Sequence, residues 1–162
     1  TAPASVRSVG EAVMAADRLL ETAKAQADAQ VSERNAREKA ELMRQLGMEE
    51  GESATKASRT MIRQLEEDQK RRSKRALTDA IDRALIDLLA IYRDVLMVQV
   101  GGDGELINTD LSDLVHEIAQ DSTPRQTLAR VDHIETARKR LVSNGNPLLV
   151  LEDMAISLRP QA

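Results

Sequence analysis

The sequence predicts an all-α protein, a five-helix bundle from which a long antiparallel helical hairpin protrudes. Residues 4–123 contain no proline, and the 162-residue chain has only seven glycines, so little interrupts a helix over most of the length. Apolar residues recur at helical spacing, and charged residues make up 31% of the chain. The length suits a single domain, 1–162. Because the chain lacks an initiator methionine, we expect it to be a piece of a longer one.

Two long helices are expected first, over roughly 6–46 and 58–100. The first ends at Gly47 and the second at Gly101, since glycine readily ends a helix. The link at 49–56 between them is small and polar, as a flexible turn should be.

The two long helices are predicted to fold back on each other as a hairpin. With the turn set near residue 52, Leu42 faces Ile62 and Leu20 faces Leu85, so apolar positions meet. Residues 32–75 have few large apolar side chains and many charged ones, and we expect them to protrude as a coiled-coil-like stalk with one small apolar cluster near its tip. That cluster comprises Leu42, Met43, Leu46, Met48, Met61, Ile62 and Leu65.

The second helix changes character toward its end. Thirteen of the seventeen residues at 84–100 are apolar, the exceptions being Asp87, Arg93, Asp94 and Gln99. A helix that is apolar on most sides must be surrounded by other helices.

Three shorter helices can surround it. The third is predicted to begin at a capping signal at Asn108, the fourth at Thr123 followed by Pro124, and the fifth at Asn146 followed by Pro147. The third presents Ile107, Leu111, Leu114, Val115 and Ile118 on one face, and the fourth presents Leu128, Val131, Ile134, Ala137 and Leu141. The fifth is apolar nearly all round, so with the end of the second helix it gives the bundle more apolar surface than it can bury alone. Burial between subunits would remove this surplus.

Catalytic chemistry is not expected. The chain has no cysteine, which excludes a disulfide framework and a thiol nucleophile, and no glycine-rich phosphate loop. His116 and His133 lack the spaced partners of a metal site, and we interpret them as solvated; a bundle metalloenzyme is a distant alternative. We therefore predict no catalytic, cofactor or metal residues. No apolar run reaches the ~18 residues of a membrane span, so a cytoplasmic setting is expected.

The charges are unevenly distributed. The net charge is −4, which argues against a free duplex-DNA binder. Residues 101–123 hold six acidic residues and no lysine or arginine. The basic run at 70–75 comes just after three acidic residues at 66–68. We interpret the run as a solvated face, with phosphate contact as the alternative. Arg93, Asp94 and Glu152 sit within the apolar helices, and pairing across an interface and pairing within the chain both remain open.

Several motifs resemble one known family. They are Tyr92-Arg93-Asp94-Val95-Leu96-Met97 followed by Gly101; Arg138-x-Arg140-Leu141-x-x-Asn144-x-Asn146-Pro147-x-Leu149-x-Leu151-Glu152-x-Met154; Ser122-Thr123-Pro124-x-x-Thr127-Leu128; and the stretch 36–41 closing at Leu46-Gly47. Together they resemble the C-terminal collar domain of bacterial DNA polymerase III clamp-loader subunits, in particular the delta-prime type of actinobacteria.

The resemblance implies a role in DNA replication, as an oligomerisation domain in the ring that loads the sliding clamp onto primed DNA. It implies the gamma/tau and delta subunits as partners, DNA contact only through the full complex, ATP hydrolysis by sister subunits and no membrane. The AAA+ region of that family lies upstream and is absent here. The isolated fragment is expected to be able to self-associate. The expected interface residues are Tyr92, Arg93, Asp94, Val95, Asn144, Asn146, Pro147, Leu148, Leu151 and Glu152. A gamma/tau collar and a stand-alone helical-hairpin scaffold or adaptor are the alternatives.

Overall fold

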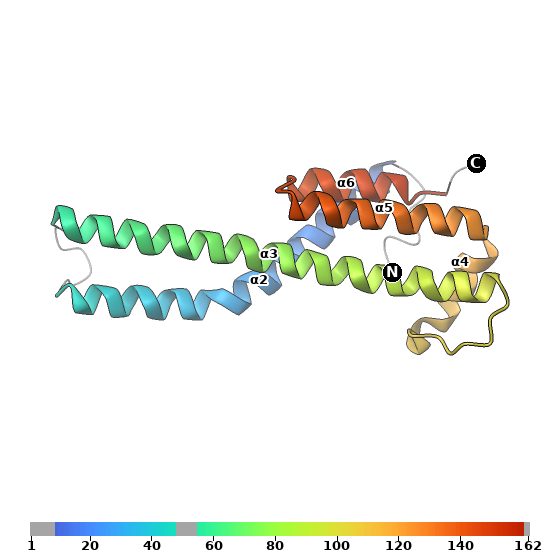
Figure 1. Ribbon diagram of the computed structural model, residues 1–162, viewed down its shortest axis with the longest axis horizontal. Coiled ribbons are helices and arrows are strands. Elements are labelled where there is room, and N and C mark those ends of the chain that lie inside the picture. Colours follow the sequence, from blue (N-terminus) through green and yellow to red (C-terminus); the bar gives the residue numbers. More distant parts are fainter. Residues whose placement is uncertain (1–8, 48–54, 161–162) are drawn as a thin grey trace. The chain divides into compact units, whose positions relative to one another are not determined.

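The computed structural model describes residues 9–47 and 55–160, and every regular element within these ranges is a helix (Figure 1). The elements are α2 (Val9–Gln45), α3 (Lys56–Gln99), a short 3₁₀ turn η1 (Thr109–Leu111), α4 (Ser112–Gln120), α5 (Pro124–Val142) and α6 (Pro147–Ser157). The prediction of an all-α protein is confirmed.

Glycine ends the two long helices as predicted. Gly47 and Gly101 adopt φ angles of 64° and 70°, a left-handed conformation that glycine adopts without steric cost. After α3, the amide of Gly102 donates to the carbonyl of Met97 at 3.0 Å and that of Gly101 donates to Val98 at 3.2 Å. This pair of bonds is a Schellman motif, which satisfies carbonyls that the end of a helix leaves open.

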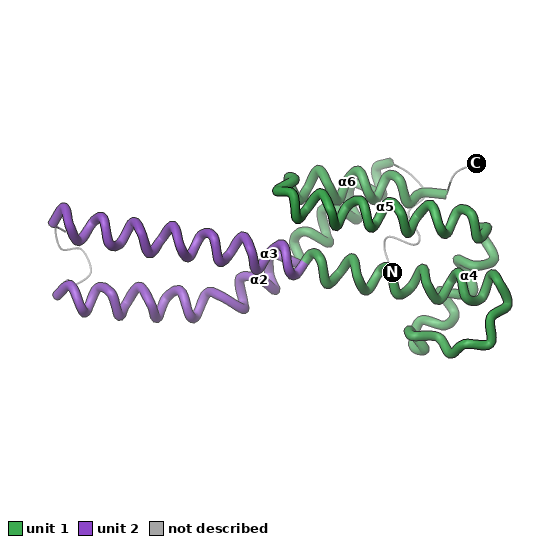
Figure 2. Tube along the Cα trace, in the orientation of Figure 1, with its two compact units in different colours: residues 1–22, 81–162 green, residues 23–80 purple. Residues whose placement is uncertain are grey.

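The chain divides into two compact units (Figure 2). Unit 1 comprises residues 1–22 and 81–162, of which 9–22 and 81–160 are described, and unit 2 comprises residues 23–80.

Unit 2 is an antiparallel pair formed by the second half of α2 and the first half of α3. Gln69 donates to the backbone carbonyl of Asn35 at 2.9 Å, and Lys39 pairs with Glu66 at 3.2 Å. Both contacts lie within one residue of the predicted register. A small apolar cluster lies in the half of unit 2 that is farther along the helices from the connection between α2 and α3. There Ala27, Val31 and Ala76 pack together with Leu77, and the small alanine side chains let the two helices approach closely.

In unit 1, α5 runs antiparallel to α3. Three contacts fix this register: Thr127 with Gln99, Arg130 over the ring of Tyr92, and Arg138 with Asp82. The buried hydrophobic side chains of unit 1 are aliphatic apart from Tyr92 and Met154. The fully buried ones include Ile81, Leu85, Val95, Val115, Ile134 and Leu151.

Two predicted apolar positions are wrong. Leu128, assigned to the inner stripe of α5, is 51% exposed, because the neighbouring Thr127 occupies the inward position. Ile107 is 57% exposed, since it lies in the loop before η1 and not on the inner face of a helix. Val115 and Ile118 of α4 are buried as expected.

Candidate functional site

The expected interface residues separate into two groups. Four have side chains buried within this chain, at 1% exposure or less: Tyr92, Asp94, Val95 and Leu151. The other six are exposed or half-buried: Arg93, Asn144, Asn146, Pro147, Leu148 and Glu152. Another protein can touch the second group directly, whereas the first group can act on an interface only by holding the bundle in shape.

Asp94 organises the loop that leads into η1. Its carboxylate accepts hydrogen bonds from the backbone amides of Ile107 at 2.9 Å and Asn108 at 2.8 Å, and from the side-chain amide of Asn108 at 3.1 Å. Arg93 lies 3.5 Å away, with half of its side chain in solvent. Burial alone would raise the pKa of Asp94, but these donors and the Arg93 charge outweigh it and hold the pKa below its usual value. The partners of the Asp94 carboxylate are therefore groups of this same chain.

This arrangement corrects the prediction that Asn108 caps a helix. A capping asparagine accepts a hydrogen bond through its side-chain oxygen. Here the side-chain nitrogen of Asn108 donates to Asp94, fourteen residues upstream, and the side chain makes no cap contact.

Gln99 joins the end of α3 to the turn between α4 and α5. Its amide nitrogen donates to the carbonyl of Ser122 at 2.9 Å and to the Ser122 hydroxyl at 3.1 Å. Its carbonyl oxygen accepts from the hydroxyl of Thr127 at 2.8 Å. Sequence reasoning missed this residue, although a lone amide in an apolar helix was the available signal.

Two further contacts hold α5 on α3. The guanidinium of Arg130 lies 6.0 Å from the centre of the Tyr92 ring, and burial raises the pKa of the Tyr92 hydroxyl. Arg138 donates to both carboxylate oxygens of Asp82, at 2.7 and 3.3 Å. The lone aromatic residue and the first residue of the closing motif therefore stabilise the bundle itself.

The closing motif is a helix-to-helix turn. Asn144 adopts a φ of 64° and its amide donates to Leu141, while the amide of Gly145 donates to Arg140 at 2.8 Å, which makes a second Schellman motif. The Asn146 side chain accepts from the amide of Leu149 at 3.2 Å and Pro147 takes the first helical position, as predicted. The motif therefore sets how α6 returns along α5.

Large apolar side chains remain exposed on either side of that turn. Val142, at the end of α5, is 78% exposed, and Leu149, in the first turn of α6, is 63% exposed. Leu148 is half-buried beside it. Exposed apolar side chains that gather at one place are typical of a contact surface.

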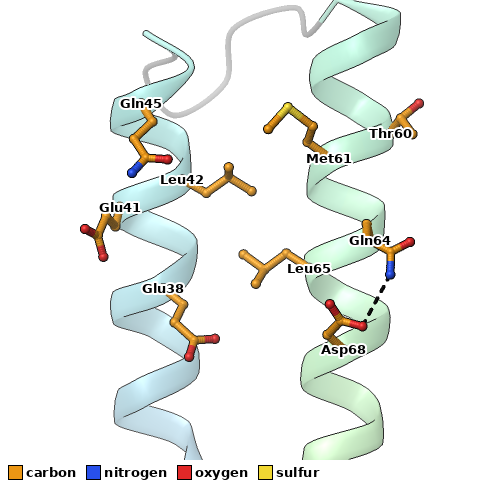
Figure 3. A pocket seen from close by; sticks show the side chains of 9 residues that line it. All are labelled: Glu38, Glu41, Leu42, Gln45, Thr60, Met61, Gln64, Leu65 and Asp68. Atoms are coloured by element: carbon orange, nitrogen blue, oxygen red, sulfur yellow. Dashed lines mark hydrogen bonds between the residues drawn. The ribbon is translucent and has the colours of Figure 1, made fainter.

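Unit 2 holds an open groove of about 510 Å³ between its two helices (Figure 3). Leu42 and Leu65 point into it, and Met61 borders it with half of its surface in solvent. The apolar cluster expected here is thus only half-buried, and Met48 lies outside the described residues. The lining residues are Glu38, Glu41, Leu42, Gln45, Thr60, Met61, Gln64, Leu65 and Asp68.

Two carboxylates at the groove are already paired. A hydrogen bond from Arg72 lowers the pKa of Glu38 to about 2, against the raising effect of burial, with further bonds from Arg34 and Gln69. Asp68 accepts from Arg71 at 2.6 Å.

His116 and His133 are both exposed, and Nδ1 of His116 lies 2.8 Å from the carbonyl of Ser112. Over residues 9–47 and 55–160, no three His, Asp or Glu side chains converge in a way that could hold a metal ion. None of the helices in the described part combines the length and hydropathy that a bilayer crossing requires.

Comparison with known proteins gives two matches. The profile of the family described as "DNA polymerase III, delta subunit, C terminal" matches residues 54–159. The DNA polymerase III subunit delta' of Bacillus subtilis (strain 168) is 36% identical over 72 residues, which cover 44% of this chain and 22% of that protein. The match thus spans about a fifth of the length of this curated relative. No solved structure matches the chain.

Proposed function

Because this chain belongs to the family formed by the C-terminal domains of DNA polymerase III delta subunits, we propose that it is an assembly domain, the collar of a delta-prime clamp-loader subunit. In this role it joins the gamma/tau and delta subunits in the ring that loads the sliding clamp onto primed DNA, while sister subunits hydrolyse ATP. The delta' name of the Bacillus relative supports the delta-prime assignment.

The observation that carries the proposal is the exposed apolar surface at the α5–α6 turn. Val142 and Leu149 expose most of their side chains to water, at 78% and 63%. Covering a side chain of this size stabilises an assembly by about 1.5–3 kcal/mol. Leu148 and Glu152 are half-buried and accessible on the same helix, so the proposed interface combines apolar contact with a charged rim.

The buried members of the expected interface act differently under this proposal. Substituting Val95 or Leu151 with aspartate would place an unpaired charge in the core and unfold the chain, since both are 0% exposed. A test of assembly therefore needs substitutions at exposed positions.

The test is co-expression of the full chain with the gamma/tau and delta subunits, followed by size-exclusion chromatography of the purified mixture. Val142→Asp combined with Leu149→Asp is expected to lower the affinity at least tenfold. Ile107→Asp combined with Leu128→Asp is the matched control, since both residues are exposed and apolar but lie away from the α5–α6 turn. Circular dichroism checks that each variant keeps its helices.

Undiminished assembly of the folded Val142/Leu149 variant would overturn the proposed interface, and so would an equal loss in the control. If the chain forms an oligomer with itself and binds neither the gamma/tau nor the delta subunit, it would be the stand-alone scaffold or adaptor instead. An intact phosphate loop in the coding sequence upstream would favour the gamma/tau collar over delta-prime.

A further inference from the structure

Exposed cations form a row along the first part of α3, in unit 2. They are Lys56, Arg59, Arg63, Lys70 and Lys74, here called the basic crest. Each is exposed, and none has an ion pair or a side-chain hydrogen bond within the described residues. At 100° and 1.5 Å per residue, the crest occupies a sector of about 60° and a length of about 27 Å.

The crest faces away from α2. The opposite side of α3 packs on that helix through Gln69, which bonds Asn35, and through Arg72, which bonds Asn35 and Glu38. Residues of the crest lie on the far side of the helix from these contacts, so the packing of the hairpin leaves them open to a partner.

The structure also separates the basic run at 70–75 into two kinds of cation. Arg72 turns inward to Glu38 at 2.9 Å, and Arg71 pairs with Asp68 at 2.6 Å. Lys70 and Lys74 point outward and join the crest. Arg75 is also exposed and has no ion pair within the described residues, but it lies outside the crest, on the same side of α3 as Arg71 and Arg72.

The acidic residues before that run are mostly neutralised elsewhere. Asp68 is held by Arg71, and Glu66 is held by Lys39 of α2. Glu67 alone lies beside the crest without an ion pair among residues 9–47 and 55–160. Basic residues outnumber acidic ones over residues 56–75, although the net charge of the whole chain is −4.

We propose that the basic crest binds the phosphate backbone of duplex DNA without regard to base sequence. The crest sector between 56 and 74 holds no apolar side chain, which disfavours insertion into a membrane surface. Lysine is depleted from the centres of protein interfaces. Sites for single-stranded DNA combine positive charge with aromatic stacking, and the only aromatic residue, Tyr92, is buried. A row of charges about 27 Å long matches the phosphates of about eight base pairs.

Such a contact is electrostatic, so its strength follows the salt concentration. Five phosphate contacts give a slope of about −4.5 in the plot of log affinity against log salt, and a loss of about 500-fold between 50 and 200 mM salt. The contact is independent of the proposed assembly interface, because it uses residues of unit 2 alone.

The test is fluorescence anisotropy of a 24-base-pair duplex titrated with the full chain at 50, 100 and 200 mM salt. The crest variant combines Lys56→Gln, Arg63→Gln, Lys70→Gln and Lys74→Gln. The matched control combines Arg34→Gln, Arg37→Gln, Lys39→Gln and Arg71→Gln, which removes the same charge from paired positions of the same hairpin.

Removing four contacts is expected to reduce the salt slope by about 3 to 4 in the crest variant, while the control keeps most of its slope. Absence of duplex binding by the unaltered chain at 50 mM salt would overturn the proposal. An equal loss in both variants would also overturn it, because net charge and not the crest would then be responsible. Tighter binding to a single strand or to phosphatidylserine vesicles than to the duplex would assign the crest to another partner.

Discussion

Replacing Asp94 with asparagine tests the part of the bundle that depends most on one side chain. The Asp94 carboxylate is fully buried and receives three hydrogen bonds, two from backbone amides and one from Asn108. Asparagine has almost the same shape but only one acceptor oxygen, and its nitrogen is itself a donor. In the Asp94→Asn variant, at least one backbone amide of the loop would therefore face the asparagine side-chain nitrogen, which cannot accept its hydrogen bond.

The magnitude follows from these three bonds. A hydrogen bond to a charged group contributes about 1.5–3 kcal/mol, and a buried donor left unsatisfied costs about 1–3 kcal/mol. An asparagine oxygen in the Oδ2 position still accepts both Asn108 bonds, which leaves the amide of Ile107 without an acceptor. We therefore expect Asp94→Asn to lower the free energy of unfolding by about 2–4 kcal/mol. The pKa of Asp94 lies below its usual value, so its ionised form stabilises the fold above about pH 4, and this contribution is lost as the pH falls through the native pKa.

Urea denaturation followed by circular dichroism measures both effects. Asp87→Asn is the matched control, because Asp87 is exposed on the same helix and its substitution should change stability by less than about 0.5 kcal/mol. The difference between the two variants should shrink as the pH is lowered from 7 toward 3. Equal stability of the two variants at pH 7 would refute the role assigned to the carboxylate.

Two further predictions concern the closing turn and the hairpin. A Cβ atom at Gly145 would lie 2.7 Å from the carbonyl oxygen of Arg140, so Gly145→Ala should cost about 1–3 kcal/mol in urea denaturation, and a change under about 0.5 kcal/mol would contradict this. Arg72→Gln should move the pKa of Glu38 from about 2 toward 4.5, as measured by NMR titration of its carboxyl carbon. Because the native pKa of Glu38 is depressed, its contribution to stability should be lost between about pH 4.5 and 2, and an unchanged pKa in the variant would show that Arg72 is not the cause.

Helix ends were predictable where their chemistry is local. Thr123 accepts from the amide of Gln126 at 3.2 Å, and the Gln126 side chain accepts from the amide of Thr123 at 3.0 Å, a capping box contained in four residues. Asn146 before Pro147 works in the same way. Asn108 has the same local preference for a cap position, but its side chain bonds to Asp94 instead. The two residues are 14 positions apart in the sequence, so a rule based on neighbouring residues could not predict this bond.

The division of side chains between core and surface needed the packed bundle. The predicted apolar stripe of α5 holds Ile134 and Leu141 in the core, but Leu128 is exposed while Thr127 and Arg130 are buried. The polar pair faces inward because Gln99 and the Tyr92 ring offer it partners there. Hydrophobicity alone could not reveal those partners.

The sequence by itself determined the all-α class, the positions where the long helices end and the antiparallel register of the hairpin. The class and the helix ends follow from proline, glycine, capping residues and the 3.6-residue period, which act within a few residues of each other. The register follows from matching apolar positions on the two sides of the turn. Only the tertiary structure decided which charges pair between helices. Arg72 reaches Glu38 and Lys39 reaches Glu66 on the facing helix, because such pairing depends on which side chains the fold brings within about 4 Å. The side chains that remain exposed after this pairing and packing form the two proposed binding surfaces, the α5–α6 turn for partner proteins and the basic crest for DNA.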